Sequence, residues 1–81
     1  MQATWQANGI IAPAGSNVAL LCQRTKNGDF RVQLLELTRS TSRRAYFQPK
    51  ALLYVAPSKD DAVAYVKRYV ETLGWSLSKS R

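Results

Sequence analysis

The sequence predicts an α+β domain, in which a small antiparallel sheet of three to five strands is followed by one C-terminal amphipathic helix packed on one face. Three observations predict it. An Asn27-Gly28 pair separates two β-prone runs, a third apolar run ends at Pro57, and a capped segment with helical periodicity follows Ser58. At 81 residues the chain suits a single domain, 1–81.

The helix is predicted by its caps and by its apolar spacing. Ser58 is a natural N-cap, Asp61 three residues later completes a capping box, and Gly74 is a natural stop. The apolar side chains fall on one arc of a helical wheel, which is typical of a helix with one face on a core. Residues 77–81 are expected to form a frayed tail. Four side chains of the arc are expected to be buried: Val66, Tyr69, Val70 and Leu73.

The first two strands are predicted at residues 18–25 and 30–38, because Asn-Gly between β-prone runs is the strongest short hairpin signal. If this pair forms a two-residue turn, Arg24 faces Arg31 on one side of the sheet. The same register places four apolar side chains on the core side: Leu21, Phe30, Val32 and Leu34.

The remaining strands are less sharply defined. Residues 51–56 form an apolar run that predicts a third strand. Residues 45–48 form either a separate strand or the first half of a longer one interrupted at Pro49, which suits an edge strand or a bulge. Residues 4–11 are a weaker strand candidate.

The first 23 residues contain no charged side chain. This segment is either part of a central strand pair with both faces covered or a surface for a partner, including a second copy in a homodimer. In both cases Trp5, Ile10 and Ile11 are expected to be covered by the sheet, by the helix or by a second protomer.

Catalysis is not expected. The chain has no histidine, which removes the commonest general base, and its single Cys22 cannot form an internal disulfide or a zinc site. The five acidic residues form no pattern for a metal or a carboxylate pair, so neither metal nor cofactor is predicted. The one cysteine favours a reducing, cytoplasmic location. The apolar runs are too short for a membrane span, and no membrane partner is expected.

Positive charge dominates and is concentrated in the middle of the chain. The net charge is +7, and residues 24–50 carry seven basic and two acidic side chains. Within this region, residues 38–50 hold four basic residues, four hydroxyl residues, two adjacent aromatics and no acid. Arginine and lysine neutralise phosphates, hydroxyls donate to phosphate oxygens, and an aromatic ring can stack on an unpaired base.

These features predict a nucleic-acid-binding domain, with DNA slightly favoured over RNA because small DNA-binding domains share this order of strands and helix. Phosphate contacts are expected from Arg39, Arg43, Arg44 and Lys50. Arg24 and Arg31 would extend the patch, and Tyr46 would stack on or orient a base. The alternative is a non-enzymatic protein-interaction module, a small accessory subunit or inhibitor whose basic loop docks on an acidic partner.

Overall fold

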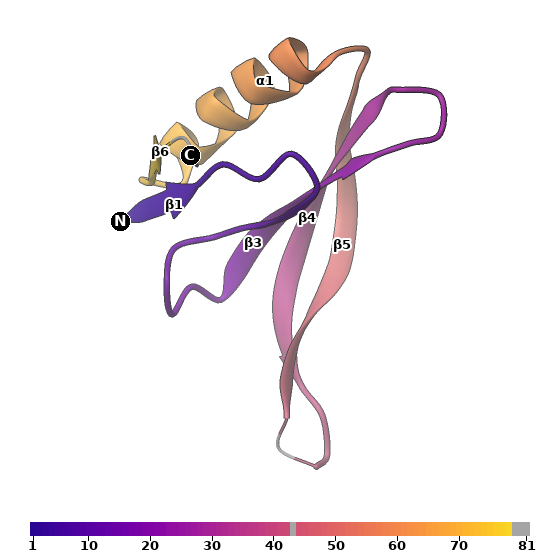
Figure 1. Ribbon diagram of the computed structural model, residues 1–81. Coiled ribbons are helices and arrows are strands. Elements are labelled where there is room, and N and C mark those ends of the chain that lie inside the picture. Colours follow the sequence, from indigo (N-terminus) through magenta and orange to yellow (C-terminus); the bar gives the residue numbers. More distant parts are fainter. Residues whose placement is uncertain (43, 79–81) are drawn as a thin grey trace.

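The computed structural model describes residues 1–42 and 44–78 (Figure 1). Its main sheet is antiparallel with the strand order β2-β3-β4-β5, and one helix lies across it. A two-stranded parallel sheet pairs β1 with β6. The predicted fold class is therefore confirmed. The elements are β1 (Gln2–Thr4), β2 (Gly9–Ile11), β3 (Val18–Arg24), β4 (Phe30–Arg39), β5 (Ala45–Ala56), α1 (Lys59–Thr72) and β6 (Ser76–Ser78).

Helix α1 begins and ends as its caps predict. The Ser58 hydroxyl accepts a hydrogen bond from the Asp61 backbone N–H at 3.2 Å, and Gly74 follows the helix with a φ of +78°. The buried line of the helix is Ala62, Val66 and Val70, which recur every fourth residue. Tyr69 and Leu73 flank this line and are half-buried, less than expected.

The core lies between α1 and one face of the main sheet. From the sheet, Leu20 and Val32 are completely buried, as is Ile11. Trp5, which precedes α1 in the sequence, and Trp75, which follows it, belong to the same cluster. Ile10 is different, since it is 48% exposed on the opposite face of β2.

Several apolar side chains of the uncharged N-terminal third thus lie in the core of their own chain. Trp5 and Ile11 are covered as expected, within the protomer, and Ile10 is not. The alternation of side chains along a strand explains the difference between the two isoleucines.

The two ends of the chain meet in the small parallel sheet. Ala3 pairs with Leu77, and the Trp5 backbone N–H donates to the Ser78 carbonyl at 2.7 Å. The predicted fraying is therefore wrong for residues 77 and 78, because Leu77 packs on the core and the backbone of β6 bonds to β1. Residues 79–81 lie outside the described residues.

The β3–β4 hairpin has a different register from the predicted one. Its last strand pair is Arg24 with Phe30, and the Thr25 N–H donates to the Asp29 carbonyl at 2.8 Å across a five-residue loop. Arg31 consequently faces Gln23, and the predicted Arg24–Arg31 pairing is wrong. The shift by one residue exchanges the faces of β3.

Strand β5 is one long edge strand with two irregularities. Its register with β4 shifts between Val32 and Gln33 and again between Leu34 and Leu35, so Leu53 and Lys50 have no partner across the ladder. Pro49 sits beside the second bulge at the free edge, where a missing N–H is tolerated. The structure thus selects the longer of the two strand arrangements considered for this segment.

Among residues 1–42 and 44–78, no helix is long and apolar enough to cross a lipid bilayer.

Candidate nucleic-acid interface

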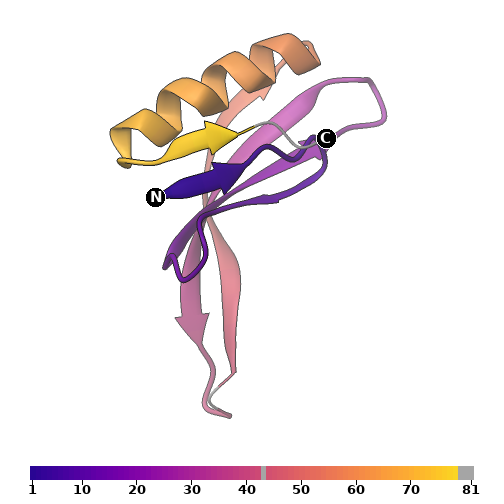
Figure 2. The same ribbon diagram turned by 60° about the vertical axis from the view of Figure 1, so that its left-hand side comes forward.

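The hairpin of β4 and β5 extends beyond the rest of the sheet. The pairing of β3 with β4 stops at Val18 and Glu36, whereas β4 and β5 remain paired as far as Arg39 and Ala45. Figures 1 and 2 show this end of the hairpin projecting away from α1. We call residues 37–47 the arm. It contains three arginines and no acidic residue.

The tip of the arm is rich in hydroxyl groups. The Ser40 N–H donates to the Arg44 carbonyl at 2.9 Å, which closes the loop. The hydroxyl oxygens of Ser40 and Ser42 lie 2.8 Å apart and share a hydrogen bond. Thr41 is exposed beside them. These groups are accessible at the end of the molecule that is farthest from the core.

The expected arm residues lie around this tip. Arg39 and Arg44 are exposed at the ends of the two strands, and Arg43 lies outside the described residues. Tyr46 is 48% exposed and pairs with Thr38. Because side chains alternate along a strand, Arg39 and Tyr46 lie on opposite faces of the ribbon.

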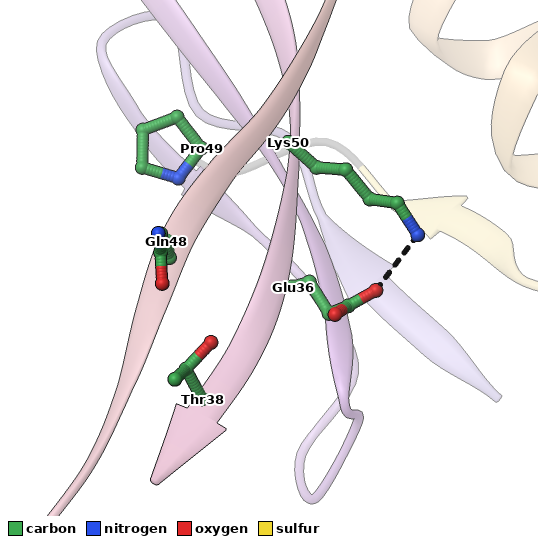
Figure 3. Close-up of a pocket in the computed structure, with 5 residues that line it drawn as sticks. All are labelled: Glu36, Thr38, Gln48, Pro49 and Lys50. Atoms are coloured by element: carbon green, nitrogen blue, oxygen red, sulfur yellow. Dashed lines mark hydrogen bonds and ion pairs between the residues drawn. The ribbon is translucent and has the colours of Figure 1, made fainter. Parts of the chain in front are cut away.

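Lys50 stands at the base of the arm and has a partner that the sequence did not reveal. Its Nζ lies 2.8 Å from a carboxylate oxygen of Glu36, and both side chains are exposed (Figure 3). The hydrogen bond to Glu36 and its negative charge raise the pKa of Lys50. This is the one ion pair of the described residues, and it borders a shallow hollow that Thr38, Gln48 and Pro49 complete (Figure 3). The charge of Lys50 is therefore partly neutralised by Glu36.

Arg24 and Arg31, the other two arginines of the predicted patch, are far from the arm. Arg31 precedes Arg39 by eight residues on β4, which corresponds to about 26 Å along the strand. Arg24 lies beside the β3–β4 loop at the same distant end. Arg39, Arg44 and Tyr46 therefore all lie on the arm, with Arg39 and Tyr46 on opposite faces of it, whereas Arg24 and Arg31 lie outside the arm.

A tyrosine cluster between β5 and α1 was not predicted. The rings of Tyr54 and Tyr65 stack with centroids 4.6 Å apart, and those of Tyr65 and Tyr69 lie 6.1 Å apart. Burial, followed by the neighbouring Tyr69 and Tyr54, raises the pKa of Tyr65. Spacing by four residues on a helix indicates the second contact. The first joins β5 to α1 and depends on how the helix packs on the sheet. Tyr65 and Tyr69 are half-buried and Tyr54 is 37% exposed, and the stacking of the rings is consistent with a packing role.

No three acidic, histidine or cysteine side chains gather where they would hold a metal ion, as far as the described residues extend. Comparison of the chain with protein-family models, with curated proteins and with solved structures finds no match. The arm combines three arginines and three hydroxyl residues at its tip with no acidic residue.

Proposed function

We propose that this protein is a nucleic-acid-binding domain, with duplex DNA as the favoured ligand, and that the arm enters a groove of the duplex. One observation carries the proposal: a two-stranded, acid-free ribbon with exposed arginines projects past the body of the fold. The major groove of B-DNA is about 12 Å wide and admits a two-stranded β-ribbon.

The contacts in this proposal are mainly to phosphates. Arg39 and Arg44 approach the backbone from the two strand ends, and the hydroxyls of Ser40, Thr41 and Ser42 donate to phosphate oxygens. Arg43 contributes a third positive charge to the same segment. Phosphate contacts carry no sequence information directly, so we expect binding with little sequence preference.

Tyr46 and Lys50 have secondary roles. Tyr46 lies on the ribbon face opposite Arg39, where it reaches a sugar or an unpaired base. Lys50 contributes less than a free lysine, because Glu36 already neutralises it. Arg24 and Arg31 are not part of the proposed contact surface. A cytoplasmic location, favoured by the single cysteine, is compatible with this role.

The proposal is tested by titrating labelled duplex DNA, single-stranded DNA and RNA at several salt concentrations. Removing one phosphate-binding side chain should reduce the salt slope for duplex by about 0.9, so Arg39→Ala combined with Arg44→Ala should reduce it by about 1.8. The matched control is Lys67→Ala with Arg68→Ala, which removes the same charge from the exposed side of α1.

If both double variants lower the slope equally, net charge rather than the arm drives binding, and the site is wrong. If the unaltered protein binds none of the three nucleic acids at low salt, the proposed function is wrong.

A further inference from the structure

One face of the main sheet has no helix over it. We call this side, opposite α1, the open face. The helix, Ala3, Trp5 and Trp75 all join the core cluster on the other side. Figures 1 and 2 show α1 on one side of the sheet only. The strand registers place these apolar residues on the open face: Ile10, Ala19, Leu21, Leu35, Leu37, Phe47, Leu52 and Val55.

The two edge strands, β2 and β5, expose aliphatic side chains on the open face. Leu52 is 50% exposed, Ile10 is 48% exposed and Val55 is 47% exposed. On the central strands β3 and β4, Leu21 is half-buried, and Ala19 and Leu35 are buried. Contiguous exposed apolar patches on small proteins commonly mark an interaction surface.

The charge on the open face has a single sign. Arg31 and Arg39 lie toward the two ends of β4. The other polar residues on this face of β3 and β4 are the neutral Gln23, on β3, and Gln33, on β4. No acidic residue belongs to this face. Asp29 is in a loop, Glu36 is on the other side of β4, and the remaining three acids are on α1. The open face is thus mainly apolar, with neutral glutamines among its side chains and an arginine toward each end of β4.

We propose that the open face binds an amphipathic helix of a partner protein, with an apolar stripe over Leu21, Leu52 and Val55 and acidic side chains toward Arg31 and Arg39. A helix that spans the roughly 26 Å between the two arginines needs about 17 residues. It would pack on this face as α1 packs on the other, so that the sheet lies between two helical layers.

Two other occupants fit the open face less well. A second copy of this chain would bring arginines toward arginines with no acid on either surface to offset them. A single-stranded nucleic acid would need aromatic rings for its bases, but the three most exposed apolar side chains here are aliphatic. Complementarity of charge and of side-chain type therefore favours the acidic helix.

Two synthetic peptides of about 18 residues provide the probes. Both carry the same leucine stripe, and the flanking positions are all glutamate in one and all lysine in the other. In a fluorescence anisotropy titration, the glutamate peptide should bind at least about tenfold more tightly than the lysine peptide. Amide chemical shifts should change on β3, β4 and β5 around Leu21, Leu52 and Val55, and not on the exposed side of α1.

Variants of the protein separate the apolar and the charged contributions. Leu52→Ser with Val55→Ser should weaken the glutamate peptide about tenfold or more, whereas Met1→Gln, at a side chain 70% exposed elsewhere, should not. Arg31→Glu should weaken the glutamate peptide and strengthen the lysine peptide, each about threefold to tenfold. Arg31 lies outside the arm, so these results are independent of nucleic-acid binding. Thermal unfolding checks that each variant is folded.

Four results would overturn the proposal. The first is no saturable binding of the glutamate peptide up to about 1 mM, which is an affinity of about −4 kcal/mol. The second is equal binding of the two peptides. The third is self-association of the free protein that Leu52→Ser with Val55→Ser abolishes, which would assign the face to a second copy. The last is binding to vesicles of anionic phospholipid without binding to either peptide, which would assign it to a membrane surface.

Discussion

Two neighbouring leucines of β3 provide the sharpest test of the fold. Leu20 is completely buried, and it pairs with Ile11 on one side and with Leu34 on the other. Leu21 is half-buried on the open face. In the hairpin register with a two-residue turn these roles are exchanged, because a slip by one residue turns every side chain of a strand to the other face. Leu20→Ala and Leu21→Ala therefore report directly on the register.

The expected magnitudes differ severalfold. Replacing a buried leucine by alanine costs about 2–5 kcal/mol, and Leu20 should fall near 3–4 because strands flank it on both sides. Leu21→Ala loses only part of the transfer free energy and leaves no closed cavity, so we expect about 1 kcal/mol. For a domain of this size, 1 kcal/mol shifts Tm by about 4–8 °C. Leu20→Ala should then lower Tm by more than about 12 °C.

Urea unfolding followed by tryptophan fluorescence suits this comparison, because Trp5 and Trp75 are both buried in the core. The midpoint should move while the dependence on urea stays the same, which shows that stability alone has changed. A loss for Leu21→Ala equal to or larger than that for Leu20→Ala would refute the register and, with it, the composition of the open face.

Three further perturbations have defined outcomes. Glu36→Gln frees Lys50 and removes a negative charge at the base of the arm, so duplex affinity measured by anisotropy at low salt should rise about twofold to fivefold; a decrease would contradict the proposed orientation. Ser58→Ala removes the acceptor for the Asp61 N–H and should cost about 1 kcal/mol in urea unfolding, whereas no loss would mean that the cap is unimportant. Burial raises the pKa of the Cys22 thiol, so a thiol reagent should modify it only as fast as the protein opens. Because the unfolded chain then loses this proton at lower pH than the native protein, stability should fall as pH rises above about 8.5, and a rise between pH 8 and 10 would count against this burial.

The elements that the sequence predicted well are those set by local chemistry. The Ser58 cap, the periodicity of α1 and the stop at Gly74 all depend on residues within a few positions of one another. The Asn27-Gly28 pair likewise located the hairpin. It did not determine the register, because Gly28, at a φ of +88°, serves a five-residue loop as well as a two-residue turn. The choice between them depends on which leucine of β3 is buried against the core.

The β1–β6 pair was beyond such reasoning. Its strands have three residues each, and the hydrogen bond between Ser78 and Ala3 joins residues 75 positions apart. No local sequence pattern predicts a pairing between strands this short and this far apart in the sequence. For the site, composition identified the charges of residues 38–50 but not their surroundings. The Lys50–Glu36 pair and the separation of Arg31 from Arg39 both follow from the pairing of β4 with its neighbours.

The lengths of two elements explain why this fold leaves two parts of its surface uncovered. Helix α1 has 14 residues and is about 21 Å long, whereas the 12 residues of β5 extend over about 40 Å. One helix can therefore cover only about half the length of the hairpin. The uncovered half is polar and basic at the arm, as a solvated ribbon must be, whereas the open face keeps exposed aliphatic side chains on β2 and β5. Arg39 belongs to both surfaces, whereas Arg44 lies only on the arm and Leu52 only on the open face, so substitutions at Arg44 and at Leu52 should affect different partners. If Arg44→Ala weakened the acidic peptide as strongly as Leu52→Ser with Val55→Ser does, the two surfaces would be one.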